Sequence, residues 1–141
     1  MTKSLLTGLA LLVMCATPHL SRAQTQTREQ AAQTVAEQWL ALVDGAKYPE
    51  SWDSMAGYFK EAVSKRKWRS TITEIRKPLG KVLSRKLKSA EYSKELSGAP
   101  EGEYVVLKFD VVFEKKTSAV ETVTTLLGQD LFWRVSGYAV K

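Results

Sequence analysis

Residues 119–140, AVETVTTLLGQDLFWRVSGYAV, carry one glutamate among side chains that alternate between apolar and polar. The alternation places Glu121 beside apolar neighbours, where loss of hydration favours the neutral carboxyl group and suits a general acid or base. Gly137, which the predicted pairing sets next to Glu121, leaves space for a ligand. Glu121 is therefore a candidate catalytic acid or ligand contact. The alternative is a structural carboxylate at the open end of the sheet, solvated or paired with a lysine or arginine.

Acid–base catalysis by Glu121 needs a second polar group, and the sequence offers the hydroxyls of Tyr58 and Tyr92. No motif brings either tyrosine close to Glu121, so both are candidate ligand contacts only. Cys15 and His19, the only cysteine and histidine, lie in the first 23 residues. If those residues are removed, the chain has no thiol nucleophile, imidazole base or soft metal ligand. We therefore expect no Cys–His or Ser–His–Asp catalysis, no metal site and no cofactor.

Residues 1–23 have the organisation of a secretory signal peptide. Lys3 supplies a positive charge, and an apolar stretch of residues 5–16 follows it. Ser21 and Ala23 are small residues at the positions that signal peptidase reads. The apolar stretch is shorter than the about 20 residues of a membrane-spanning helix. We expect cleavage after Ala23, export to the periplasm or the extracellular space, and no transmembrane helix afterwards. A retained membrane anchor is the alternative.

Positive charge is concentrated between Lys60 and Lys88, where eleven basic residues accompany two acidic ones. Seven of these cations surround or follow Trp68: Lys65, Arg66, Lys67, Arg69, Arg76, Lys77 and Lys81. Such a cluster can hold phosphates or carboxylates. Export and the absence of a recognition motif argue against nucleic acid. The expected partner is an anionic envelope component, such as lipopolysaccharide or phospholipid head groups, or an acidic protein. The alternative is a solvated helix face with Trp68 in the core.

Three apolar series with helical spacing precede the strands. The first follows a capping box formed by Thr27 and Gln30 and ends near Gly45. The second follows Pro49, and the third ends at the stop signal of residues 78–80. The apolar positions are, in turn, Ala32, Val35, Ala36, Trp39, Leu40 and Val43; Trp52, Met55, Phe59 and Val63; Trp68, Ile72, Ile75 and Leu79. Whether the second and third series form two helices or one bent helix stays open.

After Gly80 the apolar period changes to two residues, which predicts strands. Residues 81–96 form a polar strand suited to a sheet edge, and residues 104–114 form a strand with one apolar face. The last hairpin turns at Gly128–Asp130, with Val123 opposite Val135. By the same rule, the predicted pairs of the preceding hairpin are Phe109 with Val123 and Val111 with Glu121.

These elements predict one α+β domain, residues 24–141, in which two to three N-terminal helices pack on a curved four-stranded antiparallel meander. One face of the sheet packs on the helices and the other is mostly wet. The predicted outer face includes apolar residues that make a homodimer through the sheet conceivable. These are Val106, Val112, Val120, Leu126, Phe132 and Tyr138.

Several segments in order resemble a known bacterial family. They are WLALVDGAKYPESWDSMAGYFKEAVSKRKW, RKPLGKVLSRKLKSAEY, GAPEGEYVVLKF and AVETVT…WRVSGYAVK. Together they are similar to the domain-of-unknown-function family numbered 4019, which implies a small exported bacterial protein and no particular activity. The order of helices and curved sheet also resembles the nuclear-transport-factor-2-like and cystatin-like folds. Enzymes of that group use acids, tyrosines or histidines inside the sheet, and this chain has no inward histidine to match them.

The sequence therefore favours a non-catalytic binding module that contacts an anionic envelope component or a partner protein through the basic cluster. The alternative is a small-ligand pocket protein, or an enzyme, that uses the concave sheet face around Glu121.

Overall fold

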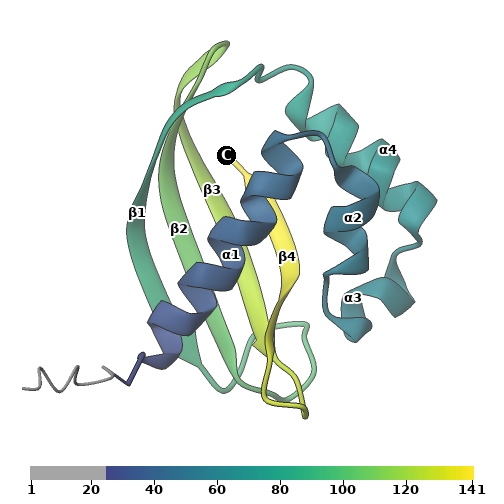
Figure 1. Ribbon diagram of the computed structural model, residues 1–141, viewed down its shortest axis with the longest axis vertical. Coiled ribbons are helices and arrows are strands. Elements are labelled where there is room, and N and C mark those ends of the chain that lie inside the picture. The colour runs from purple at the N-terminus through teal and green to yellow at the C-terminus, as the bar shows by residue number, and fades with distance from the viewer. Residues whose placement is uncertain (1–24) are drawn as a thin grey trace, which may run out of the picture.

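The computed structural model describes residues 25–141, so the predicted signal peptide lies outside the described residues. In this part of the chain, four helices precede four strands, and the helices lie on one face of the sheet (Figure 1). The prediction of an α+β fold with its helices before an antiparallel sheet is confirmed. Among the helices of residues 25–141, none is long and apolar enough to cross a membrane.

Helix α1 (Arg28–Asp44) begins at the predicted capping box. The hydroxyl of Thr27 accepts a hydrogen bond from Gln30 N, and the side chain of Gln30 accepts one from Thr27 N. The helix runs across the sheet and contacts all four strands (Figure 1). Its buried residues recur at helical spacing, as the sequence pattern predicts: Ala32, Ala36, Trp39, Leu40 and Val43.

The second and third apolar series form three helices, α2 (Tyr48–Asp53), α3 (Gly57–Ala62) and α4 (Lys65–Arg76). The second series is divided because Ala56 N donates a hydrogen bond to Val135 O in the sheet, at 2.8 Å. A backbone amide that is bound to a strand cannot also continue a helix, since each residue has a single N–H. The described residues 25–141 therefore contain one helix more than the predicted maximum of three.

The sheet consists of β1 (Val82–Ser93), β2 (Tyr104–Phe113), β3 (Lys116–Leu127) and β4 (Trp133–Val140), in sequence order and antiparallel. Strand β1 lies at an edge, as predicted for the polar segment 81–96. It has two register irregularities, and the exposed Lys86 and Lys88 lie along it. Bulges and lysines are devices that protect an edge strand from pairing with another chain.

The core lies between the helices and the inward face of the sheet. Alternate residues of β2 are buried against the helices: Val105, Leu107, Phe109, Val111 and Phe113. The ring of Trp39 lies 5.9 Å from that of Trp68, measured between centroids. Ser51 satisfies both indole N–H groups, because its carbonyl accepts from Trp39 and its hydroxyl accepts from Trp68. The helical layer is thereby joined by apolar packing and by buried hydrogen bonds.

The register of β2 against β3 differs from the prediction by two residues. Phe109 lies opposite Glu121, so the predicted pairs Phe109–Val123 and Val111–Glu121 are wrong. The turn takes only residues 114–115 between the paired ends of the strands. A displacement by two residues keeps every side chain on its face. Glu121 therefore still faces the helices.

The register of β3 against β4 is also displaced. Thr125, rather than Val123, lies opposite Val135, because the loop between the strands takes residues 128–132 instead of three residues. Val135 remains buried against the helices, again because the displacement is even.

A bulge in β4 changes which residues face the core. Thr125 pairs with Val135 and Thr124 pairs with Gly137, so Ser136 is an extra residue on β4. One extra residue reverses the alternation beyond it. The prediction that Tyr138 lies on the outer face is therefore wrong, and Tyr138 packs against the Trp39 ring.

Candidate functional site

Glu121 lies in β3 with 0% of its surface exposed. Its Oε2 accepts a hydrogen bond from Arg85 Nε at 2.7 Å, and its Oε1 accepts one from the Tyr138 hydroxyl at 2.6 Å. The Nη1 of Arg76 lies 3.7 Å from Oε1. Val140, not the predicted Gly137, lies opposite Glu121 on β4. Both carboxylate oxygens are thus engaged by the protein itself.

Asp44, the last residue of α1, extends this arrangement. Arg85 binds it with two nitrogens, Nη1 to Oδ2 at 2.7 Å and Nη2 to Oδ1 at 3.0 Å. Arg76 Nη2 donates to Asp44 Oδ1 at 2.8 Å. Two carboxylates and two guanidinium groups therefore balance in charge. We call Asp44, Arg76, Arg85, Glu121 and Tyr138 the charge cluster.

Burial and neighbouring charges shift the pKa values of Asp44, Arg85 and Tyr138 in the charge cluster. Burial alone would raise the pKa of Asp44, but the hydrogen bonds from Arg85 and Arg76 outweigh it and lower the pKa. Burial and the neighbouring Glu121 carboxylate raise the pKa of Tyr138. Burial opposes the charge of Arg85, yet Asp44 and Glu121 raise its pKa above the usual value. The hydrogen bonds of the charge cluster join α1, α4, β1, β3 and β4.

Arg76 belongs to this core and not to the surface on which the sequence analysis placed it. It is 6% exposed, and its guanidinium lies 5.3 Å from the centre of the Phe113 ring. Its Nε and Nη1 have no hydrogen-bond partner among the described residues. The signal in the sequence was its spacing, because Arg76 follows Trp68 and Ile72 at intervals of four on the buried face of α4.

Neither tyrosine named in the sequence analysis contacts Glu121. Tyr58 lies on α3 and is 42% exposed. Tyr92 lies on β1, and its hydroxyl donates to Glu103. The bulge at Ser136 supplies Tyr138 in their place. Pattern reasoning missed Tyr138 because strict alternation sends it to the outer face.

Of the remaining cations of the predicted basic cluster, Lys65 is partly buried and forms an ion pair with Asp53 at 2.6 Å. The other five are exposed. We call Arg66, Lys67, Arg69, Lys77 and Lys81 the basic surface. Within residues 25–141, none of these five has an ion-pair partner. Arg66 and Arg69 line a shallow depression of about 470 Å³ on α4, together with Ser70, Thr73 and Glu74. The side chain of Glu74 is already bound by the Ser70 hydroxyl.

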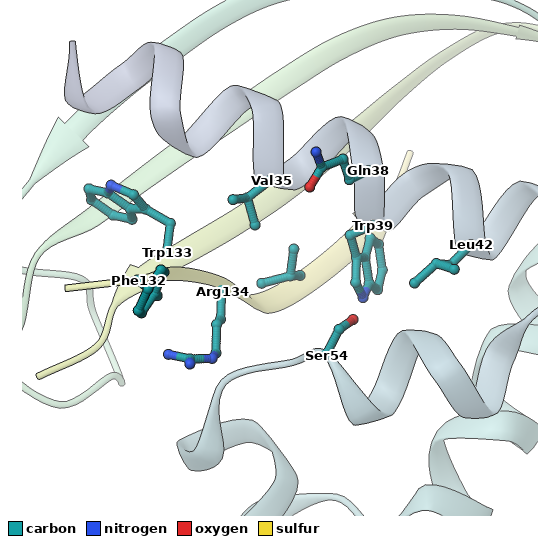
Figure 2. Close-up of a pocket in the computed structure, with 9 residues that line it drawn as sticks. Val35, Gln38, Trp39, Leu42, Ser54, Phe132, Trp133 and Arg134 are labelled. Atoms are coloured by element: carbon teal, nitrogen blue, oxygen red, sulfur yellow. The ribbon is translucent and has the colours of Figure 1, made fainter. Parts of the chain in front are cut away.

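A more apolar feature lies between α1 and the start of β4, which we call the α1–β4 cleft. Its volume is about 480 Å³. Figure 2 shows its two walls, one from α1 and one from the residues around the start of β4. The lining residues are Val35, Gln38, Trp39, Leu42, Ser54, Phe132, Trp133, Arg134 and Val135. From the sequence, Trp39 was expected in the apolar series of the first helix and Phe132 on the outer face of the sheet, so the cleft was not predicted.

The loop between β3 and β4, residues 128–132, forms a tip at the mouth of this cleft. Leu131 and Phe132 are 78% and 67% exposed, and Leu131 adopts a left-handed conformation with φ of 65°. Asp130 accepts hydrogen bonds from Phe132 N and from two nitrogens of Arg134. We call the Asp130–Arg134 pair the clasp. A Cβ atom at Gly128 would lie 2.5 Å from Asp130 Oδ1, so a larger residue there would force the Asp130 side chain to move.

In residues 25–141, no group of three acidic, histidine or cysteine side chains is placed to hold a metal ion. The family model described as "Protein of unknown function (DUF4019)" matches residues 35–138, which contain the whole charge cluster, the basic surface and the α1–β4 cleft. A search of curated proteins finds no match. The family match covers well over half of the sequence and confirms the resemblance of the four motif segments. The chain belongs to the DUF4019 family of proteins of unknown function.

Proposed function

We propose that the protein is exported and acts as a non-catalytic binding module that contacts an anionic component of the bacterial envelope through the basic surface. One observation carries the proposal. Five exposed cations gather on and after α4 without an ion-pair partner in the described part of the chain. Unneutralised positive charge of this kind attracts phosphate and carboxylate groups.

The geometry of α4 supports this assignment. Trp68, Ile72 and Arg76 occupy its buried face. Arg66, Arg69 and Lys77 follow one another at spacings of three and eight residues, which keep them on one exposed face of a helix. Arg76 and Arg85 are therefore engaged in the charge cluster, whereas the five cations of the basic surface remain exposed to a partner.

Export rests on the predicted signal peptide, and an intact-mass measurement tests it. The protein isolated from a bacterial envelope fraction should have the mass of residues 24–141, since cleavage is expected after Ala23. A mass that includes residues 1–23 would contradict export by cleavage. A mass increased by a lipid would instead support the retained anchor.

Vesicle cosedimentation tests the partner. We expect binding to vesicles that contain phosphatidylglycerol to exceed binding to pure phosphatidylcholine, and we expect this difference to shrink as salt rises. The double variant Arg66→Glu/Arg69→Glu should weaken binding by at least about 30-fold, because each cation near an anionic surface contributes about 1 kcal/mol.

The matched control is Lys86→Glu/Lys108→Glu, which makes the same change in net charge on exposed residues of the sheet. It should weaken binding much less than the variant on α4. An equal loss in the two double variants would show that only net charge matters, and would refute the assignment to the basic surface.

The alternative, a pocket or enzyme around Glu121, receives less support from the geometry. The Glu121 carboxylate is enclosed and bound by Arg85 and Tyr138. A general acid or base needs hydrogen-bond access to its substrate. The arrangement is better suited to holding the helices on the sheet.

A further inference from the structure

We propose that the α1–β4 cleft binds an acyl chain that ends in an uncharged ester or hydroxyl group. The cleft shares no lining residue with the charge cluster or the basic surface. The inference is therefore independent of the proposed contact with an anionic envelope component.

The cleft has the size and shape for a chain. One wall consists of Val35, Trp39 and Leu42, which lie on one side of α1 and extend about 10 Å along it at about 1.5 Å per residue. Phe132 lies on the facing wall, and Val135 is also a lining residue. The volume of about 480 Å³ falls within the range of small-molecule sites. These apolar walls favour an apolar ligand.

Trp39 favours a flexible chain over a flat ligand stacked on its ring. Trp39 is 3% exposed, and its ring packs against Trp68 and Tyr138, with centroid separations of 5.9 and 5.3 Å. Little of the Trp39 ring is therefore left for the cleft, beside the branched side chains of Val35 and Leu42. A methylene chain can follow such mixed walls, whereas stacking of a sugar or purine ring on Trp39 needs an open face of that ring.

The polar groups at the rim favour an uncharged end on the ligand. They are the amide of Gln38, the hydroxyl of Ser54 and the guanidinium of Arg134. Two nitrogens of Arg134 are bound to Asp130, so a carboxylate would meet a neutralised cation and a nearby acid. The side chain of Gln38 makes no hydrogen bond within residues 25–141 and can donate to an ester carbonyl.

The tip extends the apolar surface beyond the mouth of the cleft. Leu131 is held in a left-handed conformation, which is unfavourable for a branched side chain. Such a conformation persists only where its surroundings impose it, and these positions are frequent at ligand sites. The clasp imposes it here, and Leu131 and Phe132 remain exposed where a longer chain would leave the cleft.

A chain-length series tests the proposal. Purified protein is titrated with 1-hexanoyl-, 1-octanoyl- and 1-decanoylglycerol below their micelle concentrations, with calorimetry and tryptophan fluorescence as readouts. Affinity should rise about fifteenfold for each two carbons, which corresponds to about 0.8 kcal/mol per buried methylene. Sodium decanoate should bind at least tenfold more weakly than 1-decanoylglycerol. Absence of a length dependence, or tighter binding of decanoate, would overturn the proposal.

Two variants locate the site, one on each wall. Phe132→Ser and Val35→Gln should each weaken the binding of 1-decanoylglycerol by at least tenfold. Urea unfolding reports whether each variant remains folded. Leu83→Ser is the matched control, because Leu83 is 64% exposed and Phe132 is 67% exposed. Arg66→Glu/Arg69→Glu should leave acyl binding unchanged. An equal loss in Leu83→Ser, or none in either cleft variant, would refute the site.

Vesicles of pure phosphatidylcholine distinguish a soluble acyl ligand from a membrane lipid. Binding to both the soluble series and the vesicles would identify membrane lipids as a source of the chain. Binding to the soluble series alone would identify a free ligand. Either of these two results supports the cleft as an acyl-binding site. Vesicle binding without binding of the soluble series would assign the tip to membrane contact and overturn the cleft as an acyl site.

Discussion

Two arginine–carboxylate pairs in this protein have the same length and opposite surroundings. Arg85 Nε lies 2.7 Å from Glu121 Oε2 in the core, and Arg134 Nη2 lies 2.7 Å from Asp130 Oδ2 in the clasp. The Glu121 side chain is fully buried, whereas half of the Asp130 side chain is exposed. A short contact therefore does not define the role of an ion pair. The role of an ion pair depends on the free-energy cost of removing its charges from water.

The two pairs also differ in what they connect. The charge cluster joins residues from three strands and from the ends of two helices, so its loss disturbs the whole fold. The clasp joins residues four positions apart and shapes one loop. We therefore expect changes in the charge cluster to alter stability and changes in the clasp to alter the tip.

The largest effect is expected for Glu121→Leu. The substitution leaves Arg85 and Arg76 without their buried carboxylate, and removing one partner of a buried pair costs about 3–5 kcal/mol of unfolding free energy. Urea denaturation followed by circular dichroism measures the loss. The double variant Glu121→Leu/Arg85→Leu is the control, and it should be less destabilised than the sum of the two single variants. Additive losses would contradict coupling within the charge cluster.

A smaller effect is expected for Tyr138→Phe, which removes the hydrogen bond to Glu121 and retains the ring against Trp39. The loss should be about 1.5–3 kcal/mol, as for a hydrogen bond to a charged group. The raised pKa of Tyr138 adds a pH dependence. Above the ordinary tyrosine pKa the unfolded chain releases a proton that the folded protein keeps, so wild-type stability falls as pH rises. In Tyr138→Phe, the free energy of unfolding should fall less at alkaline pH than in wild type. An alkaline pH dependence equal to that of wild type would contradict this role of Tyr138.

Asp44→Asn should reduce the acid sensitivity of the fold. The folded pKa of Asp44 is lowered, so its contribution to stability is complete above the unfolded value of 3.8 and is lost as pH falls through the folded pKa. Urea midpoints measured from pH 6 to pH 3 should therefore decline less steeply in the variant. At neutral pH we expect a loss of about 1–2 kcal/mol from the removed charge-assisted hydrogen bonds. A steeper acid decline would refute the assignment.

The smallest effect on stability is expected for Asp130→Asn. Hydrogen bonds from Arg134 lower the pKa of Asp130 to about 2, but the pair is exposed to solvent, and such pairs stabilise proteins weakly. The melting temperature should stay close to that of wild type, while limited proteolysis at the tip should become faster. A large drop in melting temperature would show that the clasp supports the fold and not only the loop.

Much of this architecture could be predicted from the sequence because the responsible signals are local. The capping box at Thr27, the apolar stripes and the alternation in residues 104–113 each depend on neighbouring positions. The inward orientation of Glu121 follows from the same alternation, and it survived a register error because the error was even.

What could not be predicted depends on distant segments or on one inserted residue. The bulge at Ser136 turns Tyr138 inward, and no local pattern announces a bulge of this kind. The bond from Ala56 to Val135 divides a helix by contact with a strand far along the chain. The partnership of Asp44 with Arg85 also spans long sequence separation. Arg76 is different, because its position on the apolar stripe was visible in the sequence.

The hydrogen bond from Ala56 to Val135 has a further consequence for self-association. A sheet can grow by strand addition only along an edge with free backbone groups. At the β4 edge, the Ala56 amide occupies the Val135 carbonyl, and at the β1 edge two irregularities interrupt the hydrogen-bond repeat. The four-stranded sheet is therefore a poor template for strand addition by other molecules, so concentrated protein should resist fibril formation.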